Sequence, residues 1–194
     1  DKNLASSPLT HLIGAQTALL EGDSEKASDR FTLMLEDKDA AFMGLRGLIS
    51  QAMKSGDREE TVGLLRQAHK LRPRTFWVVD TLFRLEAADG NWTETREILT
   101  QAKSERVYKP EVAKRYISAV DTQVAIIQYA SGDAKSALKS AKDAVSAQPD
   151  RAPAQLILAD VVKTVQSPEK AAQVLEKAWK IEPHPLYTQA YIKL

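Results

Sequence analysis

Cysteine is absent from this 194-residue sequence, which excludes disulfides, thiolate catalysis and zinc sites built on cysteine. Glycine and proline are scarce, with eight of each, so long irregular loops are not expected. The sequence has no run of about 18 apolar residues, the length that a membrane-spanning helix needs. Neither sign of charge dominates, because 27 basic and 26 acidic side chains give a net charge of +1. This balance provides no general attraction for nucleic acid or anionic lipid.

The composition favours a folded, all-helical protein. Hydrophobic residues make up 43% of the chain, which is enough to form a sizeable core. Alanine, leucine, lysine, glutamate, glutamine and arginine are plentiful, and all of them are good helix formers. We therefore expect an all-α fold.

A glycine followed by Asp or Asn recurs at a fixed distance. Gly22, Gly56 and Gly90 lie 34 residues apart, and Gly132 follows after 42 residues, which is eight more than the period. Pro149 and Pro183 lie 34 residues apart as well. A repeat of this length indicates stacked helix–turn–helix units, each of which buries its apolar face against the next.

Each repeat predicts the same local structure. The glycine ends the first helix, the Asp or Asn after it caps the second helix, and the residue before each proline leaves the helical region. Small residues and bulky apolar residues alternate along the second helix at spacings of four and three, so they share one buried face. The small ones are Ala27, Thr61, Ala68, Thr95, Ala102, Ala137, Ala141, Ala144, Ala171 and Ala178, and the bulky ones are Phe31, Met34, Leu65, Leu99 and Leu175.

The pattern resembles the tetratricopeptide repeat (TPR), whose unit has 34 residues. We therefore predict a single domain over residues 1–194, an α-solenoid of about five TPR-like helix pairs with a C-terminal capping helix. The predicted units span about 8–41, 42–75, 76–117, 118–151 and 152–185, and the cap spans 186–194. The eight extra residues fall near 103–117, and Pro110 suits the first turn of a long helix over about 111–131.

The first helices of such an array present one row of residues to the inside of the curve. Methionine, tryptophan, tyrosine and arginine in this row are types enriched where proteins bind partners. The same residues could instead pack against a neighbouring helix, and the sequence leaves both readings open. The predicted partner-binding groove consists of Met43, Arg46, Met53, Trp77, Asp80, Arg84, Ile126 and Tyr129.

No motif in the sequence argues for an enzyme. A nucleophile elbow, a phosphate-binding loop, a dinucleotide fingerprint and a zinc helix motif are all missing. The three histidines, His11, His69 and His184, are too far apart in sequence to form a local metal motif. We therefore expect a non-catalytic protein without a metal or an obligatory cofactor.

Three stretches resemble a more specific family, the HemY proteins. "FTLMLEDKDAAFMGLRGL" (31–48) is similar to the family's junction of a Met-Leu-Glu segment with a Phe-x-Gly-Leu-Arg-Gly-Leu helix. "LRPRTFWVVDTLFRLEAADGNW" (71–92) is similar to its Pro-x-x-x-Trp helix, and "AWKIEPHPLYTQAY" (178–191) to its Ala-Trp…Pro-His-Pro close.

This resemblance implies a bacterial inner-membrane protein associated with late haem synthesis. Two transmembrane helices would precede the present chain, which would be the soluble domain, on the cytoplasmic side. The implied function is a scaffold that binds proteins, including haem-pathway enzymes, in its groove. The alternative is a haem or porphyrin carrier, in which Arg46 or Arg84 meets a propionate and His11, His69 or a methionine is the candidate iron ligand.

Overall fold

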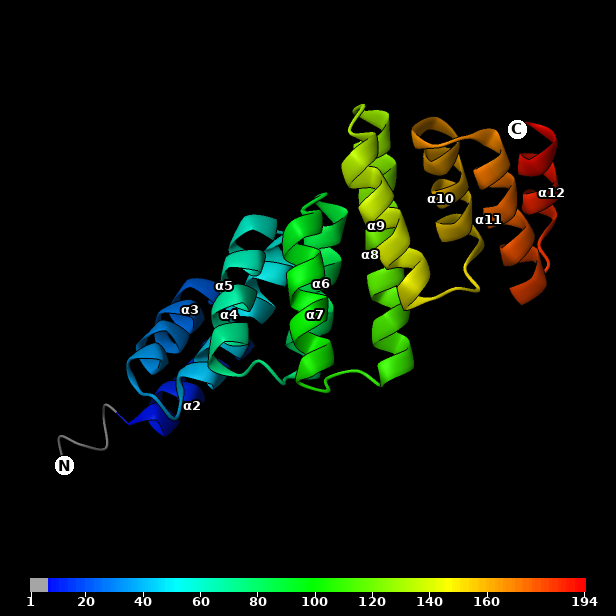
Figure 1. Cartoon of the computed structure of the whole chain (residues 1–194). Helices are drawn as coiled ribbons and strands as arrows, with labels where there is room; N and C mark the ends of the chain where they lie inside the picture. Colours follow the sequence, from blue (N-terminus) through cyan, green and yellow to red (C-terminus); the bar gives the residue numbers. More distant parts are fainter. Residues whose placement is uncertain (1–6) are drawn as a thin grey trace. The chain divides into compact units, whose positions relative to one another are not determined.

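The computed structural model describes residues 7–194, which fold into helices joined by short turns (Figure 1). The α-helices within this range are α2 (Pro8–Glu21), α3 (Ser24–Leu33), α4 (Ala41–Ser55), α5 (Arg58–Leu71), α6 (Phe76–Ala88), α7 (Trp92–Ser104), α8 (Pro110–Ala130), α9 (Ala134–Ala147), α10 (Ala152–Val165), α11 (Pro168–Ile181) and α12 (Pro185–Ile192). A 3₁₀ turn, η1 (Met34–Glu36), follows α3. No strand occurs among the described residues, so the predicted all-α solenoid class is confirmed. The first six residues of the predicted domain lie outside this range.

The glycine turns form as the repeat predicts, and three of the four expected side-chain caps form, whereas the side chain of Asn91 makes no capping hydrogen bond to α7. Gly22, Gly56, Gly90 and Gly132 all have φ between 76° and 87°, a left-handed conformation that a Cβ would disfavour. The side chains of Asp23, Asp57 and Asp133 accept hydrogen bonds from backbone N–H groups in the first turn of the helix that follows.

The prolines end the second helices as predicted. The residues before Pro73, Pro149 and Pro183 are Arg72, Gln148 and Glu182, and their φ values are −139°, −149° and −149°. These values lie outside the α-helical region, because the proline ring crowds a helical residue before it.

The eight extra residues lengthen α8 and not a loop. This helix begins with Pro110 at its first turn and has 21 residues, in agreement with the predicted long helix. The predicted boundary between the third and fourth units, at 117/118, therefore falls inside α8. The sequence period misplaces this boundary because it counts residues from glycine to glycine and does not show which element holds an insertion.

Contacts divide the described residues into two compact units, residues 7–89 and residues 90–194. In the first unit α2 packs on α3, α3 on α4, α4 on α5 and α5 on α6. In the second unit α7 packs on α8, and the succession continues through α9, α10 and α11 to α12. Each helix thus buries its apolar face against its neighbours in the chain, as in a solenoid.

The predicted small and bulky positions of the second helices are all buried. In the first unit they include Ala27, Phe31, Leu65 and Ala68, and in the second Leu99 and Leu175. No helix among the described residues is both long and apolar enough to cross a bilayer.

Candidate functional site

The candidate site in the first unit lies on the face of α4 that points away from the core. Leu45, Leu48, Ile49 and Ala52 of this helix are buried. A helix turns every 3.6 residues, so Met43, Arg46, Ser50 and Met53 form a stripe on another side. All four are exposed, and the two methionines keep 50% and 56% of their surface in contact with solvent.

Two hollows flank this stripe. The α2/α4 hollow has a volume of about 460 Å³ and is lined by Leu12, Gln16, Leu19, Phe31, Met43, Arg46, Gly47, Ser50, Gln51 and Lys54. The α4/α6 hollow has a volume of about 390 Å³ and is lined by Arg46, Ile49, Ser50, Met53, Lys54 and Trp77. Both hollows share Arg46, Ser50 and Lys54, so these residues form a ridge between them. We call the ridge with its two hollows the α4 face.

Close packing holds α4 against α3. A Cβ added to Gly47 would lie less than 3.0 Å from ring carbons of Phe31, and one added to Gly44 would lie 2.6 Å from the Phe31 carbonyl oxygen. The two glycines therefore let α3 approach α4 closely. This contact sets the floor of the α2/α4 hollow, which both Phe31 and Gly47 line.

Two arginines of α5 hold α6, which carries Trp77. Arg66 pairs with Glu86 at 2.6 Å between Nη2 and Oε1, and the Glu86 side chain is fully buried. Arg58 donates from Nε to Asp89 at 2.6 Å and from Nη2 to the carbonyl oxygen of Leu85 at 2.8 Å. A buried carboxylate needs such a partner. These pairs fix the position of α6 relative to α5.

Trp77 is also held by an aromatic neighbour. Its ring centroid lies 6.3 Å from that of Phe42, with the planes tilted by 58°. The guanidinium of Arg72 lies 4.4 Å from the Phe42 centroid, a cation–π contact. The indole is therefore supported on one side while it lines the α4/α6 hollow.

The structure brings together four of the predicted groove residues. Met43, Arg46, Met53 and Trp77 all line the α4 face. Asp80 and Arg84 lie on α6 but do not line either hollow. They form an ion pair with each other at 2.9 Å, so their charges offset one another.

Ile126 and Tyr129 belong to α8 in the second unit. Tyr129 packs against the core of that unit, and its hydroxyl lies 2.6 Å from Thr164 Oγ1 and 3.4 Å from the Asp160 carbonyl oxygen. These contacts give Tyr129 a structural role, while Ile126 is 41% exposed. A partner-binding role for Ile126 and Tyr129 stays a prediction.

The haem-carrier alternative finds no histidine at the α4 face. Neither His11 nor His69 lines either of its hollows. Among the described residues, no group of three or more His, Asp or Glu side chains could hold a metal ion. The residues of this face therefore do not fit a histidine-ligated haem.

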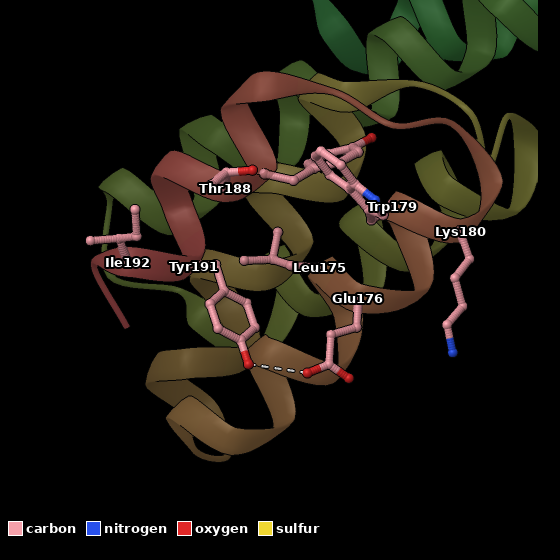
Figure 2. Close-up of a pocket in the computed structure, with 8 residues that line it drawn as sticks. Leu175, Glu176, Trp179, Lys180, Thr188, Tyr191 and Ile192 are labelled. Atoms are coloured by element: carbon pink, nitrogen blue, oxygen red, sulfur yellow. Dashed lines mark hydrogen bonds between the residues drawn. The ribbon is translucent and has the colours of Figure 1, made fainter.

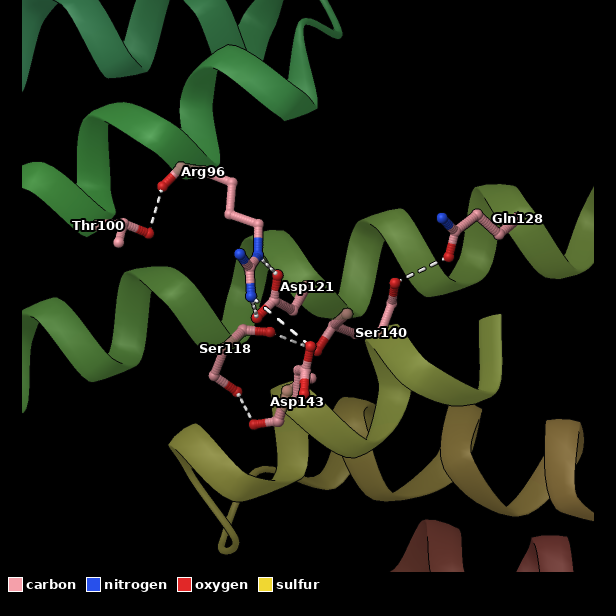
Figure 3. A network of polar contacts seen from close by, with 9 residues as sticks. Arg96, Thr100, Ser118, Asp121, Gln128, Ser140 and Asp143 are labelled. Carbon is pink, nitrogen blue, oxygen red and sulfur yellow. Dashed lines mark hydrogen bonds and ion pairs between the residues drawn. The ribbon is translucent and has the colours of Figure 1, made fainter. Parts of the chain in front are cut away.

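The second unit contains a polar network that the sequence does not indicate (Figure 3). Arg96 of α7 donates from Nε to Asp121 of α8 at 2.5 Å, and its Nη2 lies 3.7 Å from Asp143 of α9. The Asp121 side chain is 3% exposed. Its burial raises its pKa above the ordinary value, and the hydrogen bond from Arg96 lowers it only in part. The network ties three successive helices of the second unit together.

A further hollow that the sequence did not indicate lies between α11 and α12 (Figure 2). Its volume is about 390 Å³, and Leu175, Trp179 and Tyr191 contribute to its apolar lining. The Tyr191 hydroxyl donates a hydrogen bond to Glu176 at 3.1 Å, and this bond raises the pKa of the phenol.

No known family model matches the chain, and no curated protein matches it either. Among solved structures, one similar chain comes from the structure of Naa15/Naa10 bound to HypK-THB. The similarity covers 97% of this chain and 28% of that one, with 16% identity and a TM-score of 0.56. A second similar structure is that of YrrB, a TPR protein with an unusual peptide-binding site, over 97% of this chain and 93% of that one, with 15% identity and a TM-score of 0.47. The chain is also similar to TTC0263, a thermophilic TPR protein of Thermus thermophilus, over 96% of this chain and 100% of that one, with 18% identity and a TM-score of 0.38.

At these identities the comparisons concern the fold and not the function. The similarity with a TM-score of 0.56 agrees with the succession of packed helices, and the left-handed glycines recur with the 34-residue period within the chain itself. The chain is therefore a TPR-like α-solenoid.

Proposed function

We propose that this chain is a protein-interaction domain and that its α4 face binds a segment of a partner protein. The observation that supports this proposal most strongly is the exposure of Met43 and Met53, one beside each hollow, with the supported indole of Trp77 next to Met53 in the α4/α6 hollow. Flexible methionines and a rigid tryptophan at the edges of hollows are typical of surfaces that bind peptides and helices.

The proposed role is non-catalytic. The residues that line the two hollows of the α4 face include no histidine and no carboxylate. The face therefore offers no side chain of the kinds that most often act as general acid or base. Arginine and lysine supply positive charge there, which suits binding of an anionic group.

We further propose that the partners include enzymes of haem synthesis and that the domain belongs to a bacterial inner-membrane protein, on its cytoplasmic side. The support is the resemblance of residues 31–48, 71–92 and 178–191 to the HemY family. Two of these stretches contain residues of the α4 face, namely Met43, Arg46 and Trp77.

Capture from a detergent-solubilised bacterial lysate tests the proposal. The immobilised wild-type chain is compared with an Arg46→Gln/Trp77→Ala variant and with a Lys135→Gln/Lys139→Gln control, whose changes lie on exposed positions of α9. Circular dichroism establishes that all three chains are folded. We expect the wild type and the control to retain the same proteins, haem-pathway enzymes among them, and the α4-face variant to lose them. Equal retention by all three chains would contradict a role for the α4 face.

A further inference from the structure

The charged side chains that line the α4 face are all positive. Arg46 and Lys54 are the only charged side chains that line its two hollows, and both are exposed. No carboxylate among the described residues lies within 4.0 Å of either cation. Glu25 and Glu60 line a neighbouring hollow together with Lys54 but form no ion pair with it.

Other arginines of the first unit differ from Arg46. Arg58, Arg66 and Arg84 each pair with a carboxylate of α6 or of the turn that follows it. Those pairs connect or brace helices, whereas Arg46 stands on the ridge between two hollows. A guanidinium presents a planar set of hydrogen-bond donors that matches a carboxylate, so Arg46 is placed to bind a carboxylate of another molecule.

The spacing of the two cations limits what can bind them both. They lie eight residues apart on one helix, and a rise of about 1.5 Å per residue separates them by roughly 12 Å along the axis. An extended segment advances about 3.3 Å per residue, so its matching carboxylates would lie three or four residues apart. In a bound helix they would lie about seven or eight residues apart.

We propose that the α4 face binds a segment of a partner protein that carries two carboxylates at this spacing and apolar side chains beside them. The apolar side chains enter the hollows next to Met43, Met53 and Trp77, and the carboxylates meet Arg46 and Lys54. This inference rests on the proposed function and adds the chemistry of the partner.

The size of the effect follows from the exposure of the two cations. An exposed ion pair changes an equilibrium by roughly two- to fivefold, so removal of both should weaken binding by roughly tenfold. The loss should shrink when salt is raised, because mobile ions screen exposed charges. Glutamine is a good helix former, so Arg46→Gln and Lys54→Gln should preserve α4.

A phage library of random twelve-residue peptides, selected on the purified chain, supplies the probe. We expect enriched peptides with two acidic residues three or four positions apart, or seven or eight apart, and with apolar residues beside them. Fluorescence anisotropy of the best synthetic peptide should show roughly tenfold weaker binding to an Arg46→Gln/Lys54→Gln variant. Lys135→Gln/Lys139→Gln, which changes the net charge equally, should bind as wild type does.

The outcomes separate this inference from the proposed function. Enriched peptides that lack acidic residues but lose binding to Trp77→Ala would overturn the acidic-segment inference and leave the proposed function intact. Acidic peptides that bind the Arg46→Gln/Lys54→Gln variant as tightly as the wild type would likewise overturn the acidic-segment inference and leave the proposed function intact. If no peptide is enriched over an uncoated surface, the result would contradict both the acidic-segment inference and the proposed function. Selection on an Arg46→Glu/Lys54→Glu variant should instead enrich basic peptides.

Discussion

Replacement of Arg96 by methionine should destabilise the second unit by about 3 kcal/mol at neutral pH, the lower part of the range for breaking a buried ion pair. Asp121, its partner, is 3% exposed, so Arg96→Met leaves a carboxylate buried without a cation. Methionine retains much of the aliphatic stem of arginine, which limits the loss of packing. The lower part of the range applies because the Arg96 side chain is 44% exposed, so water can reach part of the vacated space.

The loss should depend on pH. Burial raises the pKa of Asp121 above its ordinary value of 3.8, and the hydrogen bond from Arg96 lowers it in part. Without Arg96 this pKa rises further, so the folded state takes up a proton at a higher pH than the unfolded state does. Protonation then favours folding as the pH falls through the raised pKa. The difference between Arg96→Met and wild type should therefore be largest at pH 7 or above and should shrink on acidification towards pH 5.

Urea unfolding of the whole chain, followed by circular dichroism at several pH values, measures this difference. The matched control is Arg96→Met/Asp121→Asn, in which both charges are removed together. It should recover much of the stability lost in Arg96→Met, because no unpaired charge remains buried. A loss below about 1 kcal/mol that does not vary with pH would mean that Arg96 and Asp121 behave as an exposed ion pair.

Thermal unfolding measures the contributions of helix packing, helix capping and the hydrogen bonds of Tyr129. Gly47→Ala should destabilise the first unit by about 1–2 kcal/mol, because the added Cβ would collide with the Phe31 ring. Gly63→Ala should stabilise the same unit by about 0.5–1 kcal/mol, because nothing lies within 4 Å of the added Cβ and alanine favours a helix. Equal effects at the two glycines would contradict the described packing of α3 on α4. Asp57→Ala should cost about 1 kcal/mol, because α5 loses its N-cap hydrogen bond, and an unchanged melting temperature would exclude that cap. Tyr129→Phe should cost about 1 kcal/mol, because the short contact with the Thr164 hydroxyl and the long one with the Asp160 carbonyl are both lost, and a much larger loss would indicate a different role.

The helix pairs could be predicted because their signals are local. A glycine with positive φ, an aspartate cap and a proline each act on the residues next to them, so a single sequence displays them directly. The 34-residue period then repeats these signals and makes the solenoid class evident. The boundary at 117/118 was misplaced because an insertion changes the period without showing which element it lengthens.

The candidate site could be predicted only in part. Met43, Arg46 and Met53 could be placed on one side of α4, and Trp77 on α6, because the register of a helix shows which of its residues share a side. That these residues bind a partner stays a prediction. The ion pairs of Asp121 and Glu86 were not found, because they join different helices. Their partners lie 25 and 20 residues away, and helical periodicity specifies no contact over that distance.

Photo-crosslinking shows whether the α4 face contacts a partner. A photoreactive benzoylphenylalanine is placed at Ser50, on the ridge between the two hollows, and in a separate chain at Lys139 of α9 as the control. Each chain is irradiated with the captured partner, and the crosslinked peptides are sequenced by mass spectrometry. We predict that position 50 crosslinks to one defined segment of the partner, that position 139 does not, and that Trp77→Ala abolishes the crosslink. Equal crosslinking at both positions, or a crosslink at position 50 that survives Trp77→Ala, would mean that the α4 face is not the binding surface.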